Sequence, residues 1–594
     1  MRTLLVLLLV LGGLTPGPVA AAAADAVCVT SCDTLDPSRA AHESFPLPDL
    51  VINGRVLRLH ASDPDDMAWA SIDDANPGDA VWLDRSWDGG ATWDGLLGRA
   101  TVPGTWTGTR TLMYNLTDPA HHRRGLLRAC GDAHGVGCTA WIYPAVCDTA
   151  CDGTAPGTGD SQPVAPATLS GRTIRLHFDG RGLGWAGIET GGAGDEVWLD
   201  RSWDAGSSWP DGSSLGRTSV ASGAAGTHTT AFATRDPRGR LYGGSVRACG
   251  REAAHSEGSC TAWARPVTTR AAAAADALMW SYEPATAWWP SSWWNSAVAV
   301  TAMADAGGAD PELARVFDVN RVAFPAGARS SDPIDGHFTS RAIDDTEWWG
   351  LAWIAVYDRT HDQRYLTEAT TIADYVNGFW DTGTCGGGVW WDRERTYKNA
   401  VSTGLYLRLA ASLHRRIAGD AVWGQRAKTA GDWYLGSGLI NASGLVNDGL
   451  TSSCANNGQT VWTYNQGLGL GGLVELWRAT GQTSYLDAAR RLGDAAMTGL
   501  TSGGVLAESC DTGSNSCDDN QKQFKGIFMR YFGDLADATG SAPYRAFAQK
   551  QADTLWAGDR DAQNRIGQRW AGSTPNVTDW RTQASGLEAV LAAG

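Results

Sequence analysis

The sequence predicts a mainly α-helical protein, an (α/α)6 barrel preceded by two tandem all-β modules. Near residue 268 the residue pattern changes from short β-rich runs separated by Gly/Asp/Pro turns to helical periodicity. Several segments before this point recur further along the chain, and the part after it contains helical segments of two alternating kinds. We therefore divide the chain into residues 25–145 (β module, repeat 1), 146–267 (β module, repeat 2) and 268–594 (helical domain).

Residues 1–24 have the pattern of a secretory signal peptide. Arg2 forms a basic start, Leu4–Leu14 is apolar, and Ala20–Ala24 offers small residues for cleavage. The apolar run is too short to span a membrane, and no later stretch reaches the required length. The even number of cysteines, 12, fits an oxidising compartment. We expect a secreted, extracellular protein with no membrane span.

Composition limits the partners. The net charge of −16 argues against nucleic acid or an anionic membrane. The 29 Trp favour a carbohydrate partner, because indole rings pack against sugar faces, although tryptophan also fills cores. We expect a monomer without a metal or cofactor, since no cluster with metal-ligand spacing is evident.

The first two modules are predicted to be a tandem duplication. The offset between equivalent cysteines is 119 for Cys28 and Cys147 (147 − 28) and 119 for Cys130 and Cys249 (249 − 130). The other matching segments are Cys32 with Cys151, Cys138 with Cys260, 58–60 with 175–177, 81–88 with 197–204, and 128–131 with 247–250. Each copy carries short β-rich runs separated by turn residues, which is typical of an all-β module.

We predict local disulfides within each copy, although sequence alone does not fix connectivity. The predicted pairs are Cys28–Cys32, Cys130–Cys138, Cys147–Cys151 and Cys249–Cys260. In the helical domain Cys510 and Cys517 bracket a polar loop and are predicted to pair, and Cys385 with Cys454 is a further candidate pair. His337, which follows Asp335-Gly336, is expected to be a turn residue.

Residues 86–93 (SWDGGATW) resemble the Asp-box hairpin, and residues 202–209 are a near copy with Ser208 in place of Thr. In families that carry this box the Asp ties the turn and the Trp packs beneath it, so we expect a structural role. The nearby acids Asp63, Asp65, Asp66, Asp73 and Asp74 are of a type that binds calcium, but they lack a defined loop spacing. We expect a solvated face there.

Twelve segments of the third domain are predicted to be helices. Alternate segments are rich in glycine and aromatic residues, as expected of buried inner helices, and the others are amphipathic, as expected of outer ones. The predicted ranges are 270–282, 291–306, 311–322, 344–359, 363–380, 397–418, 420–436, 463–480, 483–498, 520–539, 542–557 and 579–592.

The segment from Ile343 to Tyr357 is central because Asp344 and Asp345 precede a run without charges from Trp348 onward. One interpretation is a capping box, with Asp344 as the N-cap and Glu347 three residues later. The other is a pair of catalytic carboxylates, which glycoside hydrolysis requires.

Several motifs occur in the order found in glycoside hydrolase family 76, the endo-α-1,6-mannanases. They are DDTEWW (344–349), GGGVWW (386–391), YKNA (397–400), WTYNQG (462–467), FKG (524–526), DRD (559–561) and WAG (570–572). The resemblance covers about residues 270–594, and the duplicated β region resembles the front end of secreted actinobacterial members. Two departures, Ser402-Thr403-Gly404 and Glu347, leave the preference for particular sugar positions open.

The resemblance implies an (α/α)6 barrel and a retaining endo-α-1,6-mannanase that acts on α-mannan or a related cell-wall polysaccharide. It assigns Asp344 as nucleophile and Asp345 as general acid/base. Neighbouring Cα atoms lie about 3.8 Å apart, so diverging side chains can present carboxylates about 5–5.5 Å apart, the retaining spacing. Two close acids between apolar walls also raise one pKa, which suits the two roles.

Further residues near the predicted helix starts are candidates for substrate contact. They are Trp294, Asn295, Trp348, Trp349, Trp390, Trp391, Tyr397, Lys398, Asn399, Tyr464, Asn465, Gln466, Phe524 and Lys525. For each tryptophan a core position is an equal alternative. Two other functions stay open: transfer of the glycosyl group to another sugar, and non-catalytic binding of a wall glycan.

Overall fold

The computed structural model describes residues 33–594 except 41–42, 63–66, 87–91, 116, 119–122, 125, 143–151, 158, 211, 235–242, 254, 268, 284–285, 291–292, 308–309, 512–515 and 574–575. The predicted signal peptide, both short Cys-x-x-x-Cys pairs, three acids of the 63–74 cluster and most of the first Asp-box turn lie outside these residues.

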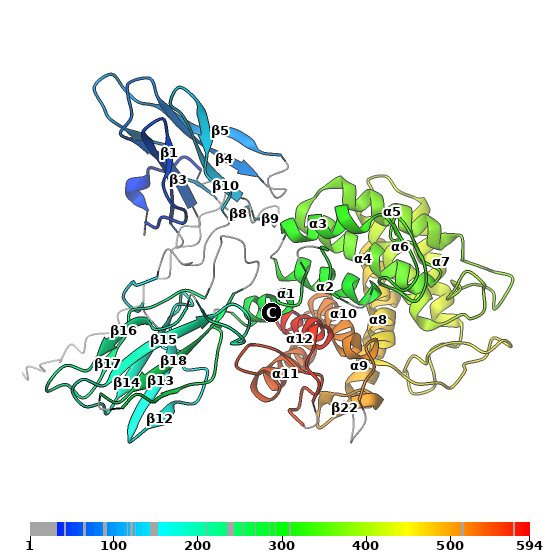
Figure 1. Cartoon of the computed structure of the whole chain (residues 1–594). Coiled ribbons are helices and arrows are strands. Elements are labelled where there is room, and N and C mark those ends of the chain that lie inside the picture. Colours follow the sequence, from blue (N-terminus) through cyan, green and yellow to red (C-terminus); the bar gives the residue numbers. More distant parts are fainter. Residues whose placement is uncertain are drawn as a thin grey trace, which may run out of the picture.

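The N-terminal part contains two β-sandwiches (Figure 1). The first pairs a sheet of order β1-β2-β3-β6, with β7 on β3, against a sheet of order β11-β10-β4-β5. Its core lies between the sheets, where Leu57 and Leu59 of one meet Val81, Leu83 and Leu127 of the other. Its strands are β1 (Leu50–Ile52), β2 (Arg55–Ser62), β3 (Met67–Asp73), β4 (Ala80–Ser86), β5 (Asp94–Thr101), β6 (Thr109–Arg110), β7 (Tyr114–Asn115), β10 (Leu126–Asp132) and β11 (Val136–Cys138). Between β7 and β10 the chain forms a separate hairpin of β8 (Thr117–Asp118) and β9 (Arg123–Arg124).

The second sandwich pairs sheets of order β12-β13-β14-β17 and β16-β15-β18-β19. Its strands are β12 (Ala167–Leu169), β13 (Arg172–Phe178), β14 (Gly184–Glu189), β15 (Glu196–Ser202), β16 (Leu215–Ser219), β17 (Thr227–His228), β18 (Ser245–Arg251) and β19 (Gly258–Cys260). In register, Arg247 lies opposite Asp200, as Arg128 lies opposite Asp84 in the first sandwich. The β-rich prediction is thus supported by two sandwiches, while the duplication itself stays a prediction from the sequence.

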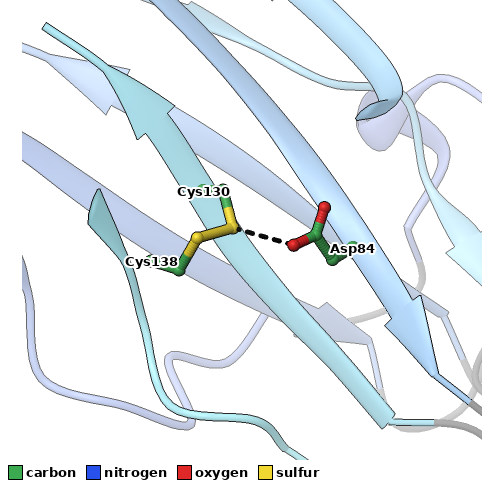
Figure 2. Close-up of side chains that lie close together, drawn as sticks. All are labelled: Asp84, Cys130 and Cys138. Atoms are coloured by element: carbon green, nitrogen blue, oxygen red, sulfur yellow. Dashed lines mark hydrogen bonds between the residues drawn. A yellow bond between two sulfur atoms is a disulfide. The ribbon is translucent and has the colours of Figure 1, made fainter. Parts of the chain in front are cut away.

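Four predicted disulfides are present: Cys130–Cys138, Cys249–Cys260, Cys385–Cys454 and Cys510–Cys517. In the first sandwich, Sγ of Cys130 lies 3.2 Å from Oδ2 of Asp84 (Figure 2). A similar group forms around Asp200 in the second sandwich. These groups are not metal sites, because both sulfurs of each are joined in a disulfide and no thiolate is available to bind a cation.

The second Asp-box lies wholly within the described residues. The Asp of the second box does tie its turn: Asp204 accepts hydrogen bonds from Ser208 N at 2.7 Å and Ser208 Oγ at 2.6 Å, and the Ser208 hydroxyl is the largest cause that lowers the pKa of Asp204 to about 2. Trp93 of the first box is 50% exposed, and its ring lies against the guanidinium of Arg128. The turn of this box lies outside the described residues, so the packing of Trp93 against it stays a prediction.

In the described part of the domain after residue 268, twelve α-helices form, as predicted. They are α1 (Arg270–Met279), α2 (Trp293–Ala306), α3 (Asp310–Asn320), α4 (Ile343–Thr360), α5 (Gln363–Asn377), α6 (Ala400–Arg416), α7 (Val422–Gly436), α8 (Thr463–Thr480), α9 (Thr483–Gly499), α10 (Phe524–Thr539), α11 (Ala542–Gly558) and α12 (Trp580–Ala592). Small hairpins are formed by β20 (Ala323–Phe324) with β21 (Ile334–Asp335), and by β22 (Thr501–Ser502) with β23 (Val505–Leu506).

The even-numbered helices form a closed inner ring, in which α2 packs on α4, α4 on α6, and so on until α12 returns to α2. The odd-numbered helices lie outside this ring (Figure 1). Inner helices are buried on almost every side: in α4 all residues from Thr346 to Val356 are buried. This is the double ring that the alternation of helix types predicted. None of the helices in the described residues combines the length and apolarity needed for a membrane span.

The capping-box interpretation of Asp344 and Glu347 is wrong. Helix α4 begins at Ile343, with Ala342 as the N-cap and no side-chain cap, so Asp344 and Asp345 lie inside the first turn. Both oxygens of Glu347 are buried and have no hydrogen-bond partner among the described residues. The backbone N–H of Ile343 is bonded to the carbonyl of Trp391 at 2.8 Å, so a neighbouring loop positions this helix end instead of a cap.

The second sandwich adjoins the helical domain at the loop after α11. Ser245 Oγ donates to Gln563 Oε1 at 2.5 Å, and Gln563 Nε2 donates to the carbonyl of Trp263 at 3.2 Å. Asn564 Nδ2 donates to the carbonyl of Pro266 at 3.0 Å. These polar contacts tie the two units together where the chain passes from β19 into α1 (Figure 1).

Candidate active site

A cleft of about 710 Å³ opens at the N-terminal ends of the inner helices. The starts of α2, α4, α6, α8 and α10 and the loops that lead into them contribute its walls. The lining residues are Trp293, Trp294, Arg329, Ser330, Ser331, Asp332, Arg341, Ala342, Asp344, Asp345, Trp348, Trp391, Tyr397, Asn399, Val401, Asp448, Tyr464, Asn520 and Phe524. Nine of the sixteen residues selected from the sequence are in this list.

Short backbone bridges hold the loops around the cleft in register. The N–H of Trp391 bonds to the carbonyl of Tyr397 at 2.8 Å, and the N–H of Ala400 bonds to the carbonyl of Asp448 at 2.9 Å. Together with the bond from Ile343 to Trp391, these link the segments that precede α4, α6 and α8. Cys385–Cys454 adds a covalent link between the last two segments. Residues more than 100 positions apart are thereby fixed around one cavity.

Asp344 and Asp345 lie in the first turn of α4, partly exposed to the cleft but surrounded by protein. Burial is the main cause that raises the pKa of both carboxyl groups. The charge of Asp344 raises the pKa of Asp345 further, and the charge of Asp332 acts in the same direction. Two neighbouring buried carboxyl groups do not both ionise readily, so the pair retains a proton well above the usual range for aspartate.

The hydrogen bonds indicate which member of the pair carries the charge. The side chain of Trp391 and the backbone N–H of Asp345 hydrogen-bond to Asp344, and both lower its pKa against the effect of burial. No such donor lowers the pKa of Asp345. The positive end of the helix dipole also favours an anion at this position. Asp344 is therefore the better carboxylate and Asp345 the better acid.

A third carboxyl group in the cleft, Asp448, was not among the predicted site residues. Burial raises its pKa, and a hydrogen bond from Tyr397 opposes the shift. Tyr397 Oη donates to Asp448 Oδ2 at 2.6 Å and accepts from Asn457 Nδ2 at 2.7 Å. Gly449 permits this arrangement, because a Cβ there would overlap the Tyr397 hydroxyl. The Asn447-Asp448-Gly449 turn was the available signal in the sequence.

Two aromatic pairs border the acids. Trp294 stacks on Trp348 with ring centroids 5.5 Å apart, and Tyr464 stacks on Phe524 at 3.9 Å. The indole N–H of Trp294 donates to Asn520 Oδ1 at 2.9 Å. All five side chains line the cleft, which combines flat apolar rings with carboxyl groups. This combination suits a sugar chain, which presents both C–H faces and hydroxyl groups.

Four polar residues predicted to contact substrate instead bind the protein framework and do not line the cleft. Lys398 Nζ donates to the carbonyls of Asp381, Thr384 and Gly387 at 2.5–2.6 Å. The other three are also engaged: Lys525 with Asp511 and the carbonyl of Gln568, Gln466 with both backbone groups of Val446, and Asn295 with Gln523. In the sequence, a polar side chain that binds the protein's own backbone cannot be told apart from one that binds a ligand.

Three more of the predicted contacts also lie outside the cleft lining. Trp349 is fully buried and stacks on Trp353 at 5.6 Å between ring centroids. Trp390 is half-buried, with Lys398 Nζ 4.8 Å from its ring centre. Asn465 is fully buried on α8. Only some residues of an inner helix face the cavity, and the sequence alone does not fix the rotation of the helix.

Six other polar residues of the lining were not predicted: Arg329, Ser330, Ser331, Asp332, Arg341 and Asn520. Arg329 lies with Cζ 4.5 Å from the ring centre of Trp288, and burial lowers its pKa. Arg341 makes ion pairs with Asp332 at 3.6 Å and Asp392 at 3.4 Å. These side chains come from irregular loops, where periodicity carries no signal.

The family model described as glycosyl hydrolase family 76 matches residues 267–593, more than half of the sequence. The chain belongs to glycosyl hydrolase family 76. Among curated relatives, the mannan endo-1,6-alpha-mannosidase DCW1 of Candida albicans is 32% identical over 215 residues, which are 33% of this chain and 47% of that protein. DCW1 of Saccharomyces cerevisiae is 30% identical over 210 residues, 33% and 46% of the two chains. The chain spans about half the length of the curated relatives it matches.

Solved family 76 structures are also similar. The α-1,6-mannanase of Salegentibacter sp. HEL1_6 is 25% identical, with a TM-score of 0.46, and the match covers 55% of this chain and 98% of that one. A variant of that enzyme with two consecutive aspartates replaced is described as inactive and was solved with α-1,6-mannotetrose. Its match is 23% identical with a TM-score of 0.46, covering 55% of this chain and 97% of that one.

Proposed function

We propose that this family 76 protein is a secreted retaining endo-α-1,6-mannanase, with Asp344 as the nucleophile and Asp345 as the general acid/base. The carrying observation is the pair of partly exposed carboxyl groups at the floor of an aromatic cleft, one of them hydrogen-bonded as an anion and the other not. The pair provides the two groups that glycoside hydrolysis requires. The α-1,6 linkage of the proposed substrate is taken from the names of the curated relatives.

In the first step, the proton of Asp345 passes to the glycosidic oxygen while an oxygen of Asp344 attacks the anomeric carbon. The bond from that carbon to the leaving oxygen breaks, and a glycosyl ester of Asp344 forms. The raised pKa of Asp345 keeps the proton in place near neutral pH. The hydrogen bonds from the backbone N–H of Asp345 and from the Trp391 side chain oppose the burial that raises the pKa of Asp344, and so favour its ionised form.

In the second step, Asp345 is a carboxylate and takes a proton from water, which attacks the anomeric carbon and releases Asp344. Two displacements at the same carbon give net retention of configuration. Adjacent positions in the chain favour the short carboxylate separation of a retaining enzyme over the wider gap that an inverting enzyme needs for its water.

Other residues of the cleft are assigned to binding. Asp448, fixed by Tyr397, is placed to accept hydrogen bonds from sugar hydroxyls. The Trp294–Trp348 and Tyr464–Phe524 pairs are platforms for pyranose rings. The four disulfides suit an extracellular location, as the pattern of residues 1–24 also does.

The test is reducing-end release from linear α-1,6-mannan by the wild type, Asp344→Asn and Asp345→Asn. We expect activity in the wild type and a loss of at least 10³-fold in both variants with unchanged far-UV spectra. The anomeric form of the first product, followed by NMR, should be α. An inert wild type, or active variants, would overturn the proposal.

Azide rescue separates the two roles. With an activated aryl α-mannoside, Asp345→Ala should regain turnover with azide and give the α-mannosyl azide, because the glycosyl ester still forms. Asp344→Ala should give the β-azide, since azide then attacks in place of the missing nucleophile. Sizing the products of mannan digestion distinguishes hydrolysis from glycosyl transfer: shorter chains indicate hydrolysis, and longer chains indicate transfer.

A further inference from the structure

The first sandwich carries a stack of aromatic rings around an arginine on the sheet β11-β10-β4-β5. Cζ of Arg128, on β10, lies 4.8 Å from the ring centre of Trp93 and 4.3 Å from that of Trp141. The two rings are 6.2 Å apart and meet edge to face. Trp93 is 50% exposed, so the stack is not part of the core between the sheets.

The charge of this arginine is balanced by one buried carboxylate. Nε and Nη2 of Arg128 donate to Oδ2 of Asp84 at 3.0 and 2.8 Å, and the side chain of Asp84 is only 5% exposed. Asp84 is itself held beside the Cys130–Cys138 disulfide (Figure 2). The face therefore presents aromatic rings and a neutralised ion pair, which fits a neutral ligand better than an acidic one.

The second sandwich has the same arrangement. Cζ of Arg247 lies 4.4 Å from the ring centre of Trp209 and 4.6 Å from that of Trp263, and the rings are 5.4 Å apart. Nε and Nη2 of Arg247 donate to Asp200 Oδ2 at 3.0 and 2.9 Å. Because Trp263 also accepts a hydrogen bond from Gln563, this copy lies at the junction with the helical domain.

We propose that Trp93, Arg128 and Trp141 form a binding site for a neutral polysaccharide, repeated in the second sandwich by Trp209, Arg247 and Trp263. The rings would stack on the apolar C–H faces of sugar units, and Nη1 of Arg128, which takes no part in the ion pair with Asp84, would donate to a hydroxyl. The site lies outside the catalytic cleft and requires no turnover, so it goes beyond the proposed function.

The test uses the full chain carrying Asp344→Asn, so that the probe is not hydrolysed. Migration is measured in native gels that contain soluble α-1,6-mannan, neutral α-glucan or polygalacturonate. We expect Trp93→Ala/Trp141→Ala to weaken retention by at least one neutral polymer tenfold or more, and addition of Trp209→Ala/Trp263→Ala to weaken it further. Trp106→Ala is the matched control, because Trp106 is 61% exposed in the same sandwich but outside the stack.

Trp93→Phe/Trp141→Phe keeps the rings and should retain at least half of the binding, which separates loss of stacking from loss of folding. Hydrolysis of α-1,6-mannotetraose by the wild type with and without the paired Ala substitutions should be equal. Unchanged retention in the Ala variants, an equal loss in Trp106→Ala, or stronger retention by the acidic polymer would overturn the proposal. Because the cleft is the same in all variants compared within one assay, failure of this site leaves the proposed reaction untouched, and an inactive cleft leaves this site untouched.

Discussion

The hydroxyl of Tyr397 donates to Oδ2 of Asp448 at 2.6 Å, which joins the segment before α6 to the segment before α8 inside the cleft. Asn457 completes the arrangement by donating to the same hydroxyl. Burial raises the pKa of Asp448, and the hydrogen bond from Tyr397, which is fixed on the opposite loop, opposes that rise.

Removal of this donor should reduce catalysis more than stability. Tyr397→Phe leaves the ring in place but takes the hydrogen bond from Asp448, so we expect kcat/KM on α-1,6-mannooligosaccharides to fall roughly 10- to 100-fold. Tyr406→Phe is the matched control, since its hydroxyl bonds to Asn377 Oδ1 at 2.6 Å away from the cleft. It should cost about 1 kcal/mol of unfolding free energy and leave kcat/KM unchanged. Equal kinetic effects of the two substitutions would contradict a role for Asp448 in the cleft.

The pH profile of kcat/KM should depend on Asp332. The negative charge of Asp332 raises the pKa of Asp345, so Asp332→Asn should lower that pKa. The acid then loses its proton at a lower pH, and the alkaline limb of the profile should move down by a few tenths of a pH unit. Asp335→Asn, which changes an exposed partner of Arg393, is the control and should not move the limb. An upward shift in Asp332→Asn would be inconsistent with Asp345 as the acid.

Glu347 should make the protein less stable as the pH rises. Its carboxyl group is fully buried, and burial followed by the charge of Asp344 raises its pKa well above the usual value. A folded-state pKa above the unfolded value means that stability is complete below about pH 4 and is lost as the pH rises through the folded pKa. Glu347→Gln lacks this loss, so its advantage in unfolding free energy over wild type should grow by about 1–3 kcal/mol between pH 5 and pH 9. Urea unfolding at both pH values measures it, and a difference independent of pH would refute the assignment.

The Cys385–Cys454 disulfide should stabilise both the fold and the cleft. It joins positions 69 residues apart, and a loop of that size is worth about 4 kcal/mol in the chain-entropy account. Cys385→Ser/Cys454→Ser should therefore lower the unfolding free energy by up to that amount and raise KM, because Tyr397 and Asp448 lie on the two linked segments. Cys510→Ser/Cys517→Ser is the comparison, because it removes a disulfide between positions only 7 residues apart. A larger loss of stability in this second variant would argue against loop length as the cause.

The sequence predicted the double ring because inner and outer helices differ in composition, but several predicted helix ends differ from the structure by a few residues. Helix α6 begins at Ala400 and not at residue 397, since the side chain of Asn399 caps it by accepting from Ser402 N. The acid pair was singled out in the sequence by its place before an apolar segment together with several family motifs in order. Asp332 and Asp448 were not, because both lie in irregular segments, where periodicity carries no signal. The framework role of Lys398 could not be predicted either, since it depends on three carbonyls of one loop meeting at one point.

At the opposite end of the inner helices, Glu475 of α8 binds arginines of α6, and this network should support stability without affecting catalysis. Its Oε1 lies 2.8 Å from Arg415 Nη1 and 3.1 Å from Arg416 Nη1, and its side chain is 1% exposed. Burial alone would raise the pKa of Glu475, but the charges of the arginines outweigh it and lower the pKa.

A lowered folded-state pKa means that the contribution of Glu475 to stability is present above about pH 4.3 and is lost as the pH falls through the folded-state pKa. Glu475→Gln should therefore cost about 3 kcal/mol at pH 7, because it removes the buried negative charge that Arg415 and Arg416 share, and less at pH 3. Asp487→Asn, in an exposed pair with Arg490, should cost under about 1 kcal/mol. Urea unfolding at the two pH values, with kcat on α-1,6-mannan measured in parallel, decides the matter: a change in kcat for Glu475→Gln would show that the far end of the barrel is coupled to the cleft.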